Sequence, residues 1–178
     1  MHRATLCRTV LFELAVMVEL RVYQDATDRA QVIALWEEVF GYSADHNAPS
    51  LVIDQKLRAG DALFFVCCES DRVVGTIMSG YDGHRGWLYS LAVHPLARKQ
   101  GYGERLVRHA ESELAARGCL KVNLQILESN KAVATFYERL GYCVEPRVSM
   151  GRRLPGSGDD TPGAESHPQR MSNLPPSI

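Results

Sequence analysis

The sequence has no large excess of charge of either sign. Its 178 residues include 20 Lys and Arg against 21 Asp and Glu, which gives a net charge of −1 and an isoelectric point near 6.6. Proteins that bind nucleic acids or anionic membranes through surface charge usually carry a clear basic excess. We therefore expect neither a nucleic acid nor a membrane as a partner.

The sequence also lacks the cysteine patterns of metal and disulfide sites. Its five cysteines are an odd number, with no C-x-x-C pair and no Cys/His spacing typical of metal ligands. Cys67, Cys68 and Cys143 fall in expected strands, where a free cysteine behaves as a small apolar side chain. This usage indicates a reducing compartment and no bound metal.

No apolar run reaches the roughly 18 residues of a membrane helix. Arg3 and Arg8 precede an apolar stretch in the manner of a signal peptide, but Glu13 interrupts that stretch and no small-residue cleavage site follows. We therefore expect a cytoplasmic protein.

The composition is that of one globular domain with extra material at both ends. Hydrophobic residues make up 46% and charged residues 23% of the chain, close to the average for globular proteins. Five of the eight prolines lie in the last 25 residues, where little apolar surface is available to offset the entropy of ordering. We expect an N-terminal extension at residues 1–16, a domain at 17–152 and a disordered tail at 153–178.

Strand and helix patterns alternate within the domain. Apolar residues at every second position predict strands, and apolar residues three and four apart predict helices. Asp28 followed by Gln31 is typical of a helix start, and Gly141 is typical of a helix end. The expected strands are residues 19–23, 63–69, 72–80, 87–93, 120–127 and 142–150, and the expected helices are 28–40, 51–59, 101–116 and 130–140.

A glycine-containing turn at residues 98–103, RKQGYG, leads from a strand into a long amphipathic helix. Gly101 and Gly103 permit positive φ and a close approach of the backbone, so the amides of this turn can converge on one anion at the helix N-terminus. This geometry predicts a site for a phosphate or pyrophosphate. A helix entered through glycines without any ligand remains an alternative.

Two common nucleotide-binding loops do not fit this turn. The dinucleotide fingerprint needs a third glycine where Leu106 stands, and the Walker loop needs a Gly-Lys-Ser/Thr sequence that is absent. A nicotinamide or ATP site is therefore poorly supported.

The turn, together with the preceding LAVHP at residues 91–95, resembles the Arg/Gln-x-x-Gly-x-Gly/Ala signature of the GNAT superfamily of N-acetyltransferases. Residues 130–142, NKAVATFYERLGY, are similar to the family's asparagine and tyrosine block. The order of expected elements agrees over about residues 18–152. Residues 80–86, GYDGHRG, further resemble the YpeA-like bacterial subgroup.

The resemblance implies an α/β (α+β) fold with a mixed central sheet of six to seven strands, flanking helices and two splayed parallel central strands. Acetyl-CoA would bind in the gap between those strands as the co-substrate. The backbone at Leu91, Ala92 and Val93 would bind the pantetheine arm and polarise the thioester. The pyrophosphate would be held by the amides of Arg98, Lys99, Gln100, Gly101, Tyr102 and Gly103.

Tyr137 stands at the family's general-acid position, where it would donate a proton to the departing thiolate. A core aromatic on the same helix face as Val133 and Leu140 is the alternative for this residue. Asn130 is read either as a helix N-cap or as a contact of the CoA arm.

The general base is not apparent, because Trp87 stands where many relatives carry a glutamate. A water ordered by backbone carbonyls or by Glu128 is the expected base. His84 is read as a turn residue, a substrate contact or a base, and Asp82 and Arg85 as an internal pair or as contacts of a substrate carboxylate.

The resemblance implies an acetyl-CoA-dependent N-acetyltransferase that acts on a primary amine of a small molecule or on a peptide N-terminus, as a monomer or homodimer. A non-catalytic CoA-binding or protein-interaction module of the same fold is the alternative.

Overall fold

The computed structural model describes residues 17–41, 47–152 and 154. The expectations for residues 1–16 and 155–178 lie outside the described residues. The elements within the described ranges are β1 (Val18–Val22), α1 (Asp25–Phe40), α2 (Pro49–Ala59), β2 (Phe64–Glu69), β3 (Arg72–Tyr81), β4 (Gly86–Val93), the short 3-10 helix η1 (Pro95–Ala97), α3 (Tyr102–Ala116), β5 (Val122–Leu124) and α4 (Lys131–Arg139).

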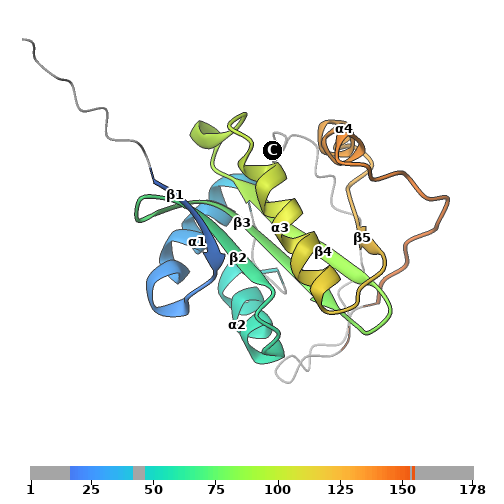
Figure 1. The fold of residues 1–178 in the computed structure, drawn as a ribbon, viewed down its shortest axis with the longest axis horizontal. Coiled ribbons are helices and arrows are strands. Elements are labelled where there is room, and N and C mark those ends of the chain that lie inside the picture. Colours follow the sequence, from blue (N-terminus) through green and yellow to red (C-terminus); the bar gives the residue numbers. More distant parts are fainter. Residues whose placement is uncertain (1–16, 42–46, 153, 155–178) are drawn as a thin grey trace, which may run out of the picture.

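The sheet has the strand order β1-β2-β3-β4-β5. Neighbouring strands are antiparallel from β1 to β4, whereas β4 and β5 are parallel. Helix α3 crosses one face of the sheet, α1 and α2 lie behind the other face, and α4 lies beside β5 (Figure 1). This arrangement confirms the expected α/β class with a mixed sheet and flanking helices.

Strand β2 shows how the alternating pattern builds both faces. Phe65 packs in the cluster with Leu106 of α3, while its neighbours Phe64 and Val66 pack in the cluster with Trp36 of α1. Successive side chains of a strand point to opposite faces, so one apolar run supplies both cores. A strand buried on both faces reads as a continuous apolar run, as β2 does.

Helix α1 begins three residues earlier than the sequence indicated. Its first residue is Asp25, and Gln24 is the N-cap. Asp28, buried within the first turn, accepts hydrogen bonds from the Gln24 amide at 2.8 Å and from both terminal nitrogens of Arg21 at 2.6 and 2.9 Å. Burial alone would raise the pKa of this carboxyl, but these hydrogen bonds outweigh burial and lower it.

The parallel pair β4–β5 is short. Its register joins Gly86, Trp87 and Leu88 to Val122, Asn123 and Leu124, and no pairing follows. The expected strand 120–127 is therefore reduced to three residues at its centre. Beyond Leu88 the two chains separate, which confirms the expected splay and leaves one edge of β4 without a neighbouring strand in the described part of the chain.

The expected strand at 142–150 is not formed, and the described residues contain five strands instead of six to seven. This segment returns beside β5 through side-chain contacts: Lys121 pairs with Glu145, and Gln125 Nε2 donates to Ser149 Oγ at 2.6 Å. Pro146 has no amide to donate to a ladder, and β5 ends too early to pair with the whole segment.

Candidate active site

A cavity of about 230 Å³ lies where β4 and β5 separate. One wall is β4 and the other is the chain that follows β5, while α4 and the end of α1 complete the lining. Its lining residues are Phe40, Leu88, Tyr89, Ser90, Leu91, Leu124, Gln125, Ile126, Leu127, Asn130, Val133 and Tyr137.

Strand β4 contains a bulge at this cavity. The β3–β4 register shifts between Thr76, which faces Ala92, and Met78, which faces Tyr89. Two residues of β4, Ser90 and Leu91, therefore stand opposite one residue of β3. Ser90 adopts φ +53°, a left-handed conformation that is uncommon for a residue with a side chain. A bulge leaves backbone groups outside the ladder, and here they border the cavity.

The glycine turn presents a row of unpaired amides at the N-terminus of α3. The amides of Lys99, Gln100, Gly101, Tyr102 and Gly103 donate to no acceptor within the described residues, whereas the Arg98 amide donates to the Pro95 carbonyl at 3.4 Å. Gly101 has φ +83°, and a side chain there would meet no atom within 4 Å. Unpaired amides at a helix N-terminus form an anion-binding site.

Two side chains of the turn point back into the protein instead of toward a ligand. The Tyr102 hydroxyl donates to Glu69 at 2.7 Å, and its oxygen lies 3.2 Å from the Gln100 side-chain oxygen. The hydrogen bond to Glu69 is the main cause that raises the pKa of Tyr102 to about 12. Arg98 Nε donates to the Val93 carbonyl at 3.2 Å. These contacts fix the turn to β2 and to the end of β4, so its amides keep their direction.

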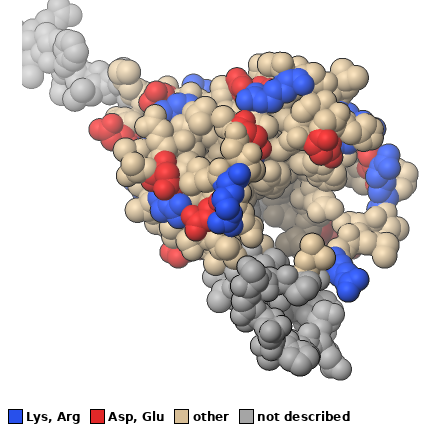
Figure 2. Space-filling view, turned by 90° about the horizontal axis from the view of Figure 1, so that it is seen from below, with Lys and Arg blue, Asp and Glu red and all other residues tan. Residues whose placement is uncertain are grey.

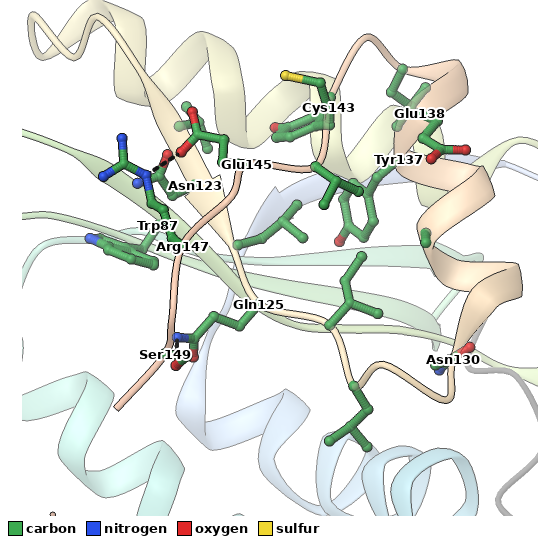
Figure 3. Close-up of a pocket in the computed structure, with 18 of the residues that line it drawn as sticks. Trp87, Asn123, Gln125, Asn130, Tyr137, Glu138, Cys143, Glu145, Arg147 and Ser149 are labelled. Carbon is green, nitrogen blue, oxygen red and sulfur yellow. Dashed lines mark hydrogen bonds and ion pairs between the residues drawn. The ribbon is translucent and has the colours of Figure 1, made fainter. Parts of the chain in front are cut away.

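A second cavity of about 1150 Å³ adjoins the first. Figure 3 shows it between α4, β5 and the returning segment, with the Glu145–Arg147 ion pair at one end and Asn130 at the other. The two cavities share Asn130, Tyr137 and residues 124–127.

Basic and acidic side chains are interspersed over the face drawn in Figure 2, without a broad patch of one sign.

Tyr137 lies between the two cavities and lines both. Its ring, 6% exposed, packs edge-on against Phe136 and Tyr142, with centroids 5.1 and 5.3 Å away, and it reaches from α4 into the cavity in Figure 3. The hydroxyl makes no hydrogen bond to any described residue. Burial, followed by the nearby charge of Glu111, raises the pKa of Tyr137, which favours the protonated form.

Asn130 and Glu128 also lie at the cavities. Asn130 is the N-cap of α4, since its side-chain oxygen accepts from the Val133 amide at 3.4 Å, and it lines both cavities. Glu128 is exposed and lines the larger cavity. Trp87, 36% exposed, lines the larger cavity as well.

The turn at residues 82–85 lines neither cavity, although Asp82 contacts the side chain of Trp87, which lines the larger one. Asp82 Oδ1 accepts from the amides of His84 at 2.7 Å and Arg85 at 2.6 Å, which is a local turn interaction. No ion pair forms between Asp82 and Arg85. From the sequence, this turn was a candidate for contacts with the substrate. In the structure it directly precedes Gly86, at the end of β4 that pairs with β5.

Sequence reasoning missed several cavity-lining residues. Phe40 reads as the last core residue of a helix, and Tyr89 and Ser90 read as ordinary strand positions. Neither strand alternation nor motif spacing reveals where two strands separate. The one signal in the sequence is Ser90, a small polar residue within an otherwise mostly apolar strand.

The described residues show neither a membrane-spanning helix nor a metal-binding cluster. No helix in them is long and apolar enough to cross a membrane. Among the same residues, no group of three or more His, Cys, Asp and Glu side chains is arranged to hold a metal ion.

A splayed parallel strand pair lies beside an amide-lined helix N-terminus, which is the arrangement that the sequence resemblance implied. The family model described as "Acetyltransferase (GNAT) family" matches residues 21–142. The chain is 41% identical over 137 residues to an acetyltransferase of Yersinia enterocolitica, covering 77% of this chain and 96% of that protein. It is also 39% identical over 137 residues to an uncharacterized N-acetyltransferase of Yersinia pestis, again covering 77% of this chain and 96% of that protein.

The structure is similar to that of the PaiA N-acetyltransferase of Thermoplasma acidophilum, solved in complex with coenzyme A. The TM-score is 0.66 at 18% identity, covering 74% of this chain and 93% of that chain. At this identity the likeness shows the fold. The chain therefore belongs to the GNAT acetyltransferase family and is an N-acetyltransferase. The YpeA-like subgroup stays a prediction.

Proposed function

We propose that the protein transfers an acetyl group from acetyl-CoA to a primary amine of a small molecule or to a peptide N-terminus. The amine nitrogen bonds to the carbonyl carbon, the carbon–sulfur bond breaks, and the sulfur takes up a proton as free thiol. The chain's own groups bind the donor, orient the carbonyl and supply that proton.

The observation that carries this proposal is the alignment of two backbone features. The five unpaired amides of the turn before α3 suit a pyrophosphate, and the free edge of β4 at Leu91 suits the extended amide-bearing arm of the donor. Backbone donors fixed in a cavity stabilise developing negative charge with little reorganisation. Both features lie at β4 and its continuation into α3, so one extended ligand can contact both.

Tyr137 is the proposed acid. Its hydroxyl has no partner among the described residues and is buried where the two cavities meet. The raised pKa keeps the proton on the hydroxyl at neutral pH. A thiolate released into the same buried space is also raised in pKa by desolvation, so proton transfer to it becomes more favourable than to a thiolate in water.

The proposed base is a water molecule held by backbone carbonyls where β4 and β5 separate. Trp87 offers no proton acceptor, and His84 lines neither cavity. Glu128, an exposed carboxylate, lines the larger cavity together with Glu111, Glu138 and Glu145, and it is the side chain proposed to assist this water.

The test combines binding with turnover. Calorimetry should detect acetyl-CoA binding to the full chain, and a free-thiol assay should detect CoA release with members of an amine and peptide panel. Tyr137→Phe should lower kcat by about 10²-fold or more, within the range for loss of a general acid, while the Kd for acetyl-CoA changes little.

Tyr142→Phe is the matched control. Its ring packs on Tyr137, but its hydroxyl donates to Glu111 at 2.8 Å, so its loss should reduce stability and leave kcat within a few-fold. No binding at millimolar acetyl-CoA would overturn the proposed function, and equal kcat values for Tyr137→Phe and wild type would remove the acid role.

A further inference from the structure

A buried chain of hydrogen bonds connects helix α1 to the bulge of β4. Trp36 Nε1 donates to Thr76 Oγ1 at 2.8 Å, and the Thr76 hydroxyl donates to the Ser90 carbonyl at 3.1 Å. Trp36 and Thr76 are both completely buried. Thr76 is one of a small number of buried polar side chains among the described residues, and both its donor and acceptor capacities are used.

The bulge needs such support because its conformation is costly. A residue with a side chain in the left-handed region costs on the order of 1–3 kcal/mol and persists where its surroundings over-determine it. At Ser90 the regular ladder with β3 is interrupted, so the Thr76 hydroxyl replaces a strand partner for the Ser90 carbonyl. Without that donor, the bulge has one fewer contact to hold it.

The bulge also determines how β4 meets the cavity. Ser90 and Leu91 both line the space between β4 and the chain after β5. A bulge changes the direction of the residues that follow it. If β4 ran without the extra residue, Leu91 would turn to the opposite face of the sheet, and the backbone groups at the cavity would change with it.

We propose that Thr76, held by Trp36, is a positioning residue for acetyl transfer. It fixes the Ser90 carbonyl and thereby sets the direction of the Leu91 backbone toward the thioester. Trp36 also packs near Phe40, with ring centroids 6.5 Å apart, so the same indole supports a second wall of the cavity. The inference rests on the proposed function for the identity of the donor.

The experiment compares Thr76→Val, Thr76→Ser and Trp36→Phe with wild type. Thr76→Val keeps the volume and removes the hydroxyl, whereas Thr76→Ser keeps the hydroxyl. Thr76→Val should lower kcat by roughly 10- to 100-fold, the loss expected from a small misplacement of reacting groups. Its affinity for CoA without the acetyl group should fall by a smaller factor than its kcat, because the amides before α3 are untouched although the Leu91 backbone borders the arm of the donor. Thr76→Ser should retain most of wild-type kcat, and Trp36→Phe should show an intermediate loss.

Ser79→Ala is the matched control. Ser79 is fully buried on the same strand, and its hydroxyl bonds to the Leu63 carbonyl at 3.5 Å instead of to β4. It should lose stability by removal of a buried hydroxyl but keep kcat. Rates are normalised to the CoA-binding sites counted by calorimetry, so that unfolded protein does not count as inactive enzyme.

Hydrogen exchange supplies a readout that does not depend on turnover. Thr76→Val should accelerate exchange of the amides at residues 90–92 relative to those of β2. Unchanged exchange overturns the inference whatever the rates show, and so does a Thr76→Val kcat equal to that of wild type or of Ser79→Ala. A loss of CoA affinity in Thr76→Val as large as its loss of kcat would indicate a general loss of packing and would also overturn it.

Failure of the proposed function looks different from failure of this inference. Wild type that binds no CoA or releases no thiol with any acceptor contradicts the proposed function. Hydrogen exchange in the same samples still shows whether Thr76 holds the bulge, and normal exchange in Thr76→Val contradicts the inference alone.

Discussion

Replacement of Gly101 by alanine should weaken CoA binding through backbone strain alone. Gly101 has φ +83°, and an added Cβ meets no atom within 4 Å, so no steric clash enters the comparison. An alanine in the left-handed region costs roughly 1–2 kcal/mol. The free turn can relieve that strain by changing φ, which turns the neighbouring amides away from their common direction.

To bind a pyrophosphate, the turn of Gly101→Ala would have to return to the left-handed conformation. The free energy of binding would therefore become less favourable by the amount of that strain. A difference of 1–2 kcal/mol corresponds to about a 5- to 30-fold increase in Kd, measurable by calorimetry with CoA. The number of CoA molecules bound per chain should not change, because the same amides bind in both proteins.

Gly118→Ala is the matched control for this variant. Gly118 has φ +85° and also faces open space, but it lies beyond the C-terminus of α3. Gly118→Ala should lose free energy of unfolding in urea without any change in CoA affinity, whereas Gly101→Ala, whose free turn relaxes, should lose less free energy of unfolding and should bind CoA more weakly. Equal CoA affinities for the two variants would refute the assignment of the turn as the pyrophosphate site.

Three further predictions follow from particular contacts. Burial raises the pKa of Tyr137 above its ordinary 10.0, so kcat should show no falling limb below about pH 10; a fall near pH 8 would exclude Tyr137 as the acid. Asp28→Asn should destabilise the fold, with Arg21 losing a carboxylate partner. Because the folded-state pKa of Asp28 is lowered, its contribution is present above pH 3.8 and lost below it, so urea midpoints of wild type and Asp28→Asn should converge only under acid conditions. Gly86→Ala places a Cβ 2.8 Å from Cys119 Sγ, and this overpacking should cost about 1–3 kcal/mol in urea unfolding; an unchanged midpoint would contradict the packing.

The sequence predicted the elements whose pattern is local. Strand β2 and helix α3 have clear periods, and their positions were predicted closely because alternation and helical spacing act over a few residues. The turn at residues 98–103 could also be predicted, since Gly101 supplies a backbone conformation that other residues avoid. The turn is the part of the site proposed to bind the pyrophosphate.

The end of the chain was harder to predict because its structure depends on a partner strand. Residues 142–150 alternate in a way typical of a strand, yet a strand forms only where a neighbour offers a ladder. Strand β5 ends at Leu124, and Glu145 and Ser149 meet it through side chains. Local pattern cannot show where a neighbour stops.

The bulge shows the same limit at the centre of the site. From sequence, Thr76 is a β-branched residue in an alternating strand, which strand propensity alone explains. Its function arises because Trp36, 40 residues away, and Ser90, 14 residues away, reach the same hydroxyl. A single buried hydroxyl with two partners couples a helix to a strand across the sheet. The part of the site proposed to orient the reaction therefore depends on long-range contacts, whereas the part proposed to bind the donor's charge is encoded in a short motif.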